Sequence, residues 1–418
     1  MSKFIVYGGH KLRGEVRVQG SKNAAFPAIA AAMLGSGVSE IRNVPDISDV
    51  HNFLEIFRFL GGNFKFTGHT LTVDPRRVVS RELPEKLAGK LRGSVLYAGA
   101  LLGKFGLARF AFPGGDAIGA RPIDVHLDGF RRLGAVVKER RGKFDVSAKQ
   151  LRGNKIVLSF TSVTGTENLI LAAVLARGTT VISLAAAEPH VQDLCNFLNK
   201  LGAKISGVGT PRITIRGVRR LGRATHTLCA DDIVAMTYAV AAAATRGEVT
   251  VNKVDLAALT APLAMLERMG VKFYAKGNMF RIQNSNKPYR ATRIITGVYP
   301  QLLTDVQPLL GVLATQCEGV SSLHDWIYEG RQGYLLALQK MGAKVELSDA
   351  HRAKIFGPCG LHGAQIKTPD IRAGASILIA ALVAKGRSVI YNAEIIDRGY
   401  EQIDQKLRDL GAKIERIN

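Results

Sequence analysis

A three-residue phrase that contains glycine recurs six times along the chain and constrains its fold more than any other feature. The phrase reads LGG, LGA, MGV or MGA, and its copies begin at Leu60, Leu133, Leu201, Met269, Met341 and Leu410. Each copy ends an amphipathic pattern, as in a helix whose C-cap glycine takes the left-handed conformation. Six copies in 418 residues predict two domains of three repeats each.

Each repeat also holds a second, much more apolar helical pattern. Examples are NAAFPAIAAAML, ENLILAAVLA and DIVAMTYAVAAAA. A helix without a polar face must be covered on all sides, whereas an amphipathic helix lies half exposed. Each repeat therefore reads as strand, buried helix, strand, surface helix and two paired strands. The predicted fold is a two-domain inside-out α/β barrel with buried central helices, which differs from a Rossmann fold and from a TIM barrel.

Charge and composition narrow the classes of function. The chain has 57 Lys and Arg against 34 Asp and Glu, and the formal net charge of +23 attracts anions. The charges are scattered, without a zinc pattern, an RNA-binding aromatic signature or a long basic tract, so phosphorylated small molecules are favoured over nucleic acid as partners.

The patterns of cysteine, histidine and hydropathy bear on the cellular location of the protein and on whether it binds a metal. The four cysteines lie far apart without a CxxC pair, and the N-terminus shows no signal-peptide pattern, so we expect a cytoplasmic protein. The longest apolar run, residues 233–244, is too short to span a bilayer, so membrane insertion is not expected. The nine histidines show no ligand spacing, and we expect no metal.

Basic residues stand at the predicted starts of helices, where they oppose the helix dipole. Acidic residues at such positions are ordinary caps and say little about function. The cations predict a ring that binds phosphate and carboxylate groups through paired hydrogen bonds. They are Lys22, Arg92, Arg121, Arg331, Arg372 and Arg398. Asp305 would remain ionised in such basic surroundings and could accept a proton, although it could instead cap the next helix.

One long loop, FPGGDAIGARP, begins at Phe112 and combines three glycines with two prolines. These residues disfavour both helix and strand. The loop is either a hinged lid or an ordinary connection. A closing lid would bring its acid, Asp116, to a substrate and shield it from water.

Five motifs together closely resemble the UDP-N-acetylglucosamine enolpyruvyl transferases over essentially the whole chain. They are GSKNAA, PGGDAIGARPIDVH, TDVQP, DIRAGAS and DRGYEQI. The resemblance implies transfer of the enolpyruvyl group of phosphoenolpyruvate to the 3′-hydroxyl of UDP-N-acetylglucosamine, with release of phosphate and without a cofactor. This would be the first committed step of peptidoglycan synthesis.

The resemblance also implies how the domains are arranged. Residues 22–229 would form a first domain with a mobile loop at 112–122, residues 1–21 and 230–418 a second, and the active site would lie in the cleft between them. Two alternatives remain open. One is a sister enolpyruvyl transferase with another acceptor, such as shikimate 3-phosphate, and the other is a non-catalytic binder of anions or nucleic acid on the same fold.

Individual roles follow from the matching motifs. Asp116 would protonate the methylene carbon of phosphoenolpyruvate, and Asp305 would accept the proton of the sugar hydroxyl. Lys22, Arg121 and Arg398 would surround the phosphate and the reacting carbon, with Lys22 and Arg398 as catalytic residues. Arg331, Arg372 and Arg398 would lie near the carboxylate. The other implied substrate-binding residues are Asn23 for the sugar, Arg92 for ordering the loop, Pro122, Asp124, Val125 and His126 for the uracil, Ser162, Val163 and Gly165 for the diphosphate, and Ile327.

Among several departures from the family, which include Asp46, Ser48 and Val234, two bear directly on inhibition and nucleotide binding. Many members carry cysteine where this chain has Asp116, and fosfomycin alkylates that thiolate. A carboxylate is a much poorer nucleophile toward the epoxide, so fosfomycin resistance is predicted. Free aspartate titrates near pH 4 and free cysteine near pH 8.5, so we also expect activity shifted toward acid pH. Phe160 stands where the family often has a lysine facing the diphosphate, which bears on nucleotide affinity.

Overall fold

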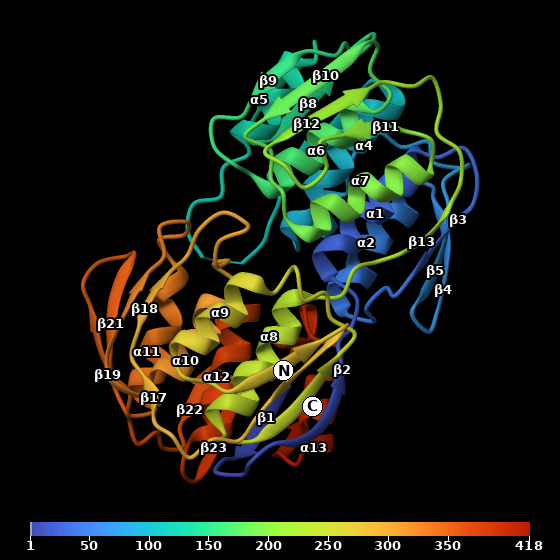
Figure 1. The fold of residues 1–418 in the computed structure, drawn as a ribbon. Coiled ribbons are helices and arrows are strands. Elements are labelled where there is room, and N and C mark those ends of the chain that lie inside the picture. Colours follow the sequence, from blue (N-terminus) through green and yellow to red (C-terminus); the bar gives the residue numbers. More distant parts are fainter. Residues whose placement is uncertain (1, 117) are drawn as a thin grey trace. The chain divides into compact units, whose positions relative to one another are not determined.

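The computed structural model describes residues 2–116 and 118–418, which divide into two compact units (Figure 1). Unit 1 comprises Met1–Gln19, Ala117–Ala120 and Ala230–Asn418. Unit 2 comprises Gly20–Asp116 and Arg121–Cys229. Each unit has three sheets and one hydrophobic core.

Unit 2 places three apolar helices among three sheets. The buried helices are α1 (Lys22–Leu34), α4 (Leu96–Phe105) and α6 (Val163–Ala173), and the amphipathic ones are α2 (Ser48–Phe59), α5 (Asp124–Arg132) and α7 (Pro189–Lys200). Two short helices, α3 (Glu85–Ala88) and the 3-10 helix η1 (Arg92–Val95), precede α4. Every residue of α1 except Asn23 is buried, as expected of a helix without a polar face.

The sheets of unit 2 have the strand orders β13-β3-β5-β4, β6-β8-β7 and β11-β12-β10-β9. Their strands are β3 (Ser39–Arg42), β4 (Asn63–Thr67), β5 (Thr70–Asp74), β6 (Leu107–Ala111), β7 (Val136–Arg140), β8 (Lys143–Ser147), β9 (Lys155–Val157), β10 (Thr179–Ser183), β11 (Lys204–Ser206), β12 (Arg212–Arg216) and β13 (Thr225–Thr227).

Unit 1 repeats this plan. Its buried helices are α8 (Asp232–Ala244), α10 (Gln307–Ala314) and α12 (Ile371–Val383), and its outer helices are α9 (Thr260–Arg268), α11 (Tyr334–Lys340) and α13 (Ile403–Asp409). The 3-10 helices η2 (Arg331–Gly333) and η3 (Ala393–Arg398) precede α11 and α13.

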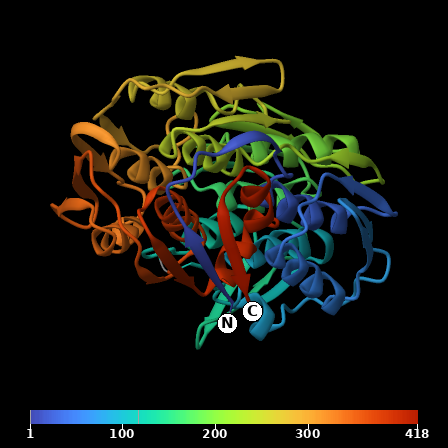
Figure 2. The same ribbon diagram turned by 90° about the horizontal axis from the view of Figure 1, so that it is seen from below.

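The sheets of unit 1 have the orders β22-β23-β1-β24, β15-β16-β14-β2 and β17-β19-β21-β20, with β18 also paired to β19. Their strands are β1 (Lys3–Tyr7), β2 (Arg13–Arg17), β14 (Glu248–Asn252), β15 (Phe273–Lys276), β16 (Met279–Ile282), β17 (Tyr289–Arg290), β18 (Arg293–Ile295), β19 (Cys317–His324), β20 (Lys344–Leu347), β21 (Arg352–Gly357), β22 (Gln365–Lys367), β23 (Arg387–Tyr391) and β24 (Lys413–Ile417). Both ends of the chain meet in one sheet, where β1 runs antiparallel to β24 (Figure 2).

The recurring glycines end helices, as the sequence predicts. The second residue of each phrase has a positive φ, with values of 99° at Gly61, 90° at Gly134, 104° at Gly202, 85° at Gly270, 91° at Gly342 and 96° at Gly411. Glycine reaches this region without a side-chain clash, so it can turn the chain from each outer helix into the next strand.

Candidate active site

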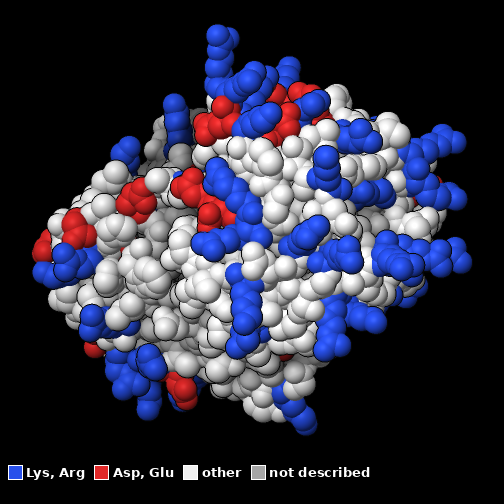
Figure 3. Space-filling model, turned by 90° about the horizontal axis from the view of Figure 1, so that it is seen from above, with Lys and Arg blue, Asp and Glu red and all other residues white. Residues whose placement is uncertain are grey.

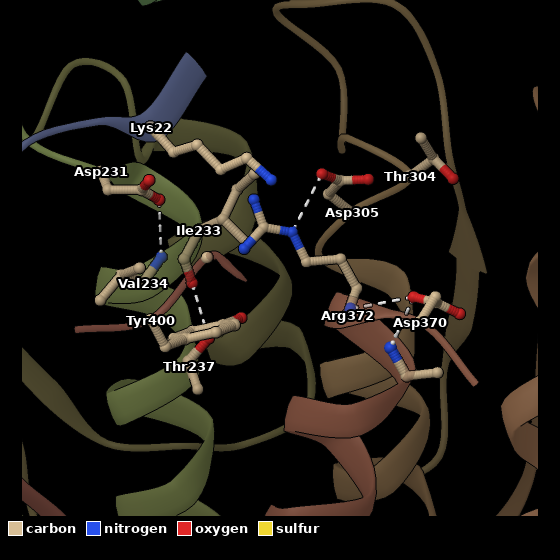
Figure 4. Close-up of polar contacts among 12 residues, drawn as sticks. Lys22, Asp231, Ile233, Val234, Thr237, Thr304, Asp305, Asp370, Arg372 and Tyr400 are labelled. Atoms are coloured by element: carbon tan, nitrogen blue, oxygen red, sulfur yellow. Dashed lines mark hydrogen bonds and ion pairs between the residues drawn. The ribbon is translucent and has the colours of Figure 1, made fainter. Parts of the chain in front are cut away.

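Asp305 is the centre of a charged cluster within unit 1. Its Oδ1 accepts a hydrogen bond of 2.7 Å from Arg331 Nη2. Its Oδ2 accepts one of 3.1 Å from Arg372 Nε (Figure 4). The two arginine side chains are only 2% and 7% exposed. Asp305 is not a helix cap, because α10 begins at Gln307 after Val306 and has no side-chain cap. The sequence therefore predicted three members of one cluster, and the capping alternative for Asp305 is wrong.

A second layer holds Arg331 in place. Thr304 Oγ1 accepts a hydrogen bond of 3.0 Å from Arg331 Nε and donates one of 2.5 Å to Asp325 Oδ2. Asp325 is fully buried, and its Oδ1 accepts from the backbone N–H of Ile327 and of Tyr328, both at 3.1 Å. Ile327, a predicted substrate residue, is thus anchored through its backbone within this layer.

Arg372 lies in the first turn of α12 and is supported on another side. Asp370 caps that helix by accepting from Arg372 N at 2.9 Å, and the guanidinium lies 5.5 Å from the centroid of the Tyr400 ring. Tyr400 Oη is 3.0 Å from Thr237 Oγ1 of α8. Burial opposes the charge of Arg372, but Tyr400, Asp305 and Asp231 raise its pKa above the ordinary value. Nη1 is buried and makes no hydrogen bond to any described residue.

Arg398 is the last residue of η3 in the same unit and is half-buried. The next residue is fixed from the N-terminal segment, because the Gly399 carbonyl accepts from Gln19 Nε2 at 3.1 Å. Gln19 Oε1 also accepts from Glu401 N at 2.9 Å. The side-chain amide of Gln19 therefore fixes the backbone on both sides of Tyr400.

In unit 2, Lys22 is the first residue of α1. Ser21 caps that helix by accepting from Ala24 N at 3.3 Å. Lys22 is 8% exposed, and its Nζ lies 2.6 Å from Asp49 Oδ2, which is also buried. The neighbouring Asn23 is the one residue of α1 that is not buried. Both predicted residues therefore stand at the N-terminus of a buried helix.

Arg92, Arg121 and Pro122 come together beside the long loop. Arg92 Nη2 donates a hydrogen bond of 2.7 Å to Pro122 O. A Cβ atom on Gly115 would lie 3.0 Å from both Arg121 Nη1 and Arg92 Cβ. Gly115 also has φ +132°, a conformation that other residues rarely adopt. The backbone next to Asp116, which is half-buried, therefore packs directly on these two arginines.

Residues 112–116 and 118–122 form no helix or strand, as predicted. The tip of this loop is bonded within unit 1. Ala120 N donates to Glu329 Oε1 at 2.7 Å, and Gly330 N donates to Ile118 O at 3.0 Å. The hydrogen bond from Ala120 lowers the pKa of Glu329.

The residues predicted to bind the nucleotide lie on α5 and at the start of α6. Ser162 caps α6 by accepting from Gly165 N at 3.2 Å, and Val163 is the first residue of the helix. A Cβ on Gly165 would lie 2.8 Å from Val125 Cγ1, so these two residues are in close contact. Asp124 begins α5 and is exposed, like Pro122 before it.

His126 is buried between α5 and α6. Its Nδ1 accepts from Asn168 Nδ2 at 2.9 Å, so its Nε2 carries the proton and faces Thr164 Oγ1 at 3.4 Å. Burial, with a contribution from Arg92, lowers the pKa of His126 to about 3, and the ring is neutral at pH 7. His126 thus fixes α5 against α6 rather than carrying a charge.

Sequence reasoning missed several residues that complete these clusters. They are Thr304, Asp325, Tyr400, Thr237 and Asn168. Thr304 and Tyr400 lie inside motifs that had been singled out, TDVQP and DRGYEQI, so those motifs carried a signal for them. The others have no local pattern, because their partners are distant in the sequence.

Two further properties concern all the described residues. Among them, no group of three or more His, Cys, Asp and Glu side chains is placed to hold a metal ion. None of the described helices has the length and apolar character needed to cross a membrane.

Known proteins share this sequence and fold. The family model described as EPSP synthase (3-phosphoshikimate 1-carboxyvinyltransferase) matches residues 6–407. UDP-N-acetylglucosamine 1-carboxyvinyltransferase 2 of Carboxydothermus hydrogenoformans is 40% identical over 419 residues, which cover 100% of both chains. The UDP-N-acetylglucosamine 1-carboxyvinyltransferase of Koribacter versatilis is 41% identical over 423 residues, covering 100% of this chain and 97% of that one.

Solved structures of other proteins have the same fold as this chain. The enolpyruvyl transferase NikO from Streptomyces tendae aligns with a TM-score of 0.90 at 28% identity, over 99% of this chain and 98% of that one. An EPSP synthase from Acinetobacter baumannii aligns with a TM-score of 0.79 over 100% of both chains, and at 18% identity it bears on the fold alone. The predicted two-domain α/β fold and the predicted family are confirmed. The chain belongs to the EPSP synthase family of enolpyruvyl transferases, among relatives that are UDP-N-acetylglucosamine 1-carboxyvinyltransferases.

Proposed function

We propose that the protein transfers the enolpyruvyl group of phosphoenolpyruvate to the 3′-hydroxyl of UDP-N-acetylglucosamine and releases phosphate. The observation that carries this proposal is the carboxylate of Asp305, held by two buried arginines that can also bind a substrate carboxylate. The full-length relatives named for this reaction support the choice of acceptor over shikimate 3-phosphate.

Arg331 and Arg372 link substrate binding to the base. Both oxygens of Asp305 accept hydrogen bonds from these guanidinium groups. The carboxylate of phosphoenolpyruvate would compete for the same donors, and Arg372 Nη1 already has no described acceptor. Release of Asp305 from the arginines would leave its oxygens available to accept the proton of the sugar hydroxyl.

The reaction is proposed to run by addition and then elimination. Asp305 takes the proton of the 3′-hydroxyl while the sugar oxygen bonds to C2 of phosphoenolpyruvate, and Asp116 gives a proton to the methylene carbon. The resulting ketal then returns a proton from its new methyl group to the Asp116 carboxylate as the bond from C2 to the phosphate oxygen breaks. Lys22, Arg121 and Arg398 would stabilise the phosphate as it leaves.

The long loop is proposed to act as a lid. The hydrogen bonds of Ile118 and Ala120 to Gly330 and Glu329 support a role in holding the lid near its working position. Gly115 leaves room for Arg92 and Arg121, so these arginines would order the segment that carries Asp116. Exclusion of water by such a lid strengthens every charge interaction around the reacting atoms.

The nucleotide is proposed to lie along α5 and α6. The N-terminus of α6, capped by Ser162, suits the negative charge of a diphosphate. Pro122, Asp124, Val125 and neutral His126 would receive the uracil. Phe160 is 50% exposed and adds no charge there, so binding of the diphosphate would depend on backbone N–H groups more than on a lysine.

The proposed location is the cytoplasm, where thiols persist, and none of the four cysteines forms a disulfide with another described residue. There the protein would catalyse the first committed step of peptidoglycan synthesis. The central arrangement of Asp305 with paired arginines disfavours a purely non-catalytic binder, because simple anion binding has no use for a carboxylate among the cations.

Release of phosphate from phosphoenolpyruvate tests this function. It is measured with UDP-N-acetylglucosamine, with shikimate 3-phosphate and with neither acceptor. We expect release with the nucleotide sugar alone. Release with shikimate 3-phosphate alone would assign the sister reaction, and binding of both substrates without any release would assign a non-catalytic binder.

A further inference from the structure

The sheet β11-β12-β10-β9 of unit 2 carries an unusual excess of cations on its exposed face. Its apolar residues, such as Ile213 and Ile215, point into the core, while Arg212, Arg216 and Lys204 point outward. No Asp or Glu occurs between Asp193 and Asp231, whereas the same stretch holds seven Lys and Arg. Figure 3 views the molecule from above, and many more Lys and Arg side chains than Asp and Glu side chains are visible on that side.

Strand register places like charges opposite one another in this sheet. Lys204 of β11 pairs directly with Arg216 of β12. Arg152 and Arg177 pair in the same way across an isolated parallel bridge, just before β9 and β10. All four side chains are exposed. Like charges directly opposite each other destabilise a sheet, so this arrangement opposes folding unless something else requires it.

Two other sheets of the protein place opposite charges across neighbouring strands, and where Arg140 of β7 pairs with Lys143 of β8, the lysine Nζ lies 2.8 Å from Glu85 Oε2. Arg109 Nε lies 3.0 Å from Asp145 Oδ2 between β6 and β8. Lys354 Nζ lies 2.9 Å from Glu346 Oε1 between β21 and β20.

Within the part of the chain that the structure describes, none of the four paired cations lies within 4.0 Å of a carboxylate oxygen. Like-charge pairs across neighbouring strands that no carboxylate of the same chain neutralises are typical of a functional surface.

The shape and amino-acid composition of this face indicate which kind of partner it binds. The four strands KIV, TTVIS, KIS and RITIR contain no aromatic residue. Proteins that bind single-stranded nucleic acid on a sheet stack its bases on aromatic side chains, so that partner is disfavoured. An exposed sheet face with several long cationic side chains suits a planar array of phosphate groups, where each basic residue raises the affinity about fivefold.

We propose that this face, defined by Lys204, Arg216, Arg152 and Arg177, binds the surface of a bilayer that contains anionic phospholipid. The contact is peripheral and electrostatic, without insertion of any segment. The two pairs lie where β9 and β10 begin, and Ser162 follows the opposite end of β9. A bilayer on this face would therefore leave the proposed nucleotide site open to solvent.

Vesicle co-sedimentation of the full chain tests the proposal. Vesicles of phosphatidylcholine alone are compared with vesicles that also contain phosphatidylglycerol, at low and at high salt. The test variant is K204Q/R216Q/R152Q/R177Q. The matched control is K344Q/R290Q/R293Q/R387Q, which removes the same charges from exposed positions of unit 1. Phosphate release by each variant shows that it is folded.

We expect binding to the anionic vesicles only, weakened by salt, reduced about 100-fold or more in the test variant and much less in the control. Equal loss in both variants would overturn the proposal, because net charge rather than this face would then explain binding. Absence of binding to anionic vesicles would also overturn it. So would preference for a single-stranded RNA oligonucleotide that displaces the protein from the vesicles, since the partner would then be nucleic acid.

Discussion

At the scale of single residues, Asp116 carries the most specific prediction. A carboxylate attacks an epoxide far more slowly than a thiolate does, so fosfomycin should leave the protein active. Asp116→Cys should become sensitive and lose activity with time in the drug, which residual phosphate release after incubation measures. Asp116→Ala should bind the nucleotide yet turn over about 100-fold to 10,000-fold more slowly, because proton transfer to carbon is lost. Rapid inactivation of the unchanged protein would contradict this account of Asp116.

Asp305→Asn is the corresponding test of the base. The amide keeps the shape of the side chain but cannot accept the hydroxyl proton, and its NH₂ group would face arginine donors. We expect kcat to fall about 100-fold or more, with a smaller change in KM for UDP-N-acetylglucosamine. Asp349→Asn is a matched control, since Asp349 is an exposed carboxylate of the same unit that pairs with Arg352 at 2.7 Å. Equal effects of the two substitutions on kcat would contradict the role of Asp305 as the base.

The arginines could be predicted from the sequence, but their common partner could not. A cation at a helix start is visible as a local pattern that opposes the helix dipole. The bonds of Asp305 join residues 26 and 67 positions apart, and only the packing of α10, η2 and α12 sets that geometry. The same reason hides the link from Thr304 to Asp325, 21 positions away.

At the scale of elements, Asn168 of α6 completes the start of α4. Its Nδ2 donates to Val95 O at 2.9 Å, and its Oδ1 accepts from Gly99 N at 2.6 Å. The amide is thus inserted between a carbonyl and the N–H four residues later, where a helical bond would otherwise form. A Cβ at Gly99 would collide with Asn168, which explains the glycine.

Asn168→Leu should therefore destabilise unit 2. The substitution leaves buried groups of Val95, Gly99 and His126 without this partner, at a loss of about 3 kcal/mol or more in the free energy of unfolding. Urea unfolding measures the change. Asn196→Leu on the exposed side of α7 is the matched control and should change stability little. Similar losses in both variants would show that the inserted amide is not important.

The first turn of α8 predicts a dependence of stability on pH. Burial, with the adjacent Asp231, raises the pKa of Asp232 to about 7. A carboxyl group whose pKa is raised by folding favours the folded state at low pH, and that contribution is lost as pH rises from about 4 through 7. Asp232→Asn should therefore raise the urea midpoint at pH 8 and change it little at pH 4. Glu318→Gln, at an exposed position of the same unit, should do neither. A midpoint of Asp232→Asn at pH 8 equal to or below that of the unchanged protein would contradict the assignment.

At the scale of the whole molecule, the repeats were the most predictable property. The backbone of each repeat has a positive φ at one position, which favours glycine, so a glycine recurs at that position in the sequence. The three apolar helices of each unit were equally visible, because a helix buried on all sides has no polar stripe. The cationic pairs of the β11-β12-β10-β9 sheet were hidden, because strand register decides that Lys204 faces Arg216. The net charge of +23 alone could not locate them.

The central claim is that this protein joins phosphoenolpyruvate to a nucleotide sugar by addition and elimination, with Asp116 and Asp305 moving the protons. Mass spectrometry of the product formed in D₂O tests it most directly. The account predicts UDP-N-acetylglucosamine that carries an enolpyruvyl group with deuterium on its methylene carbon, formed about 100-fold to 10,000-fold more slowly by Asp116→Ala. A product without deuterium, or no enolpyruvyl nucleotide sugar from the unchanged protein, would contradict the account.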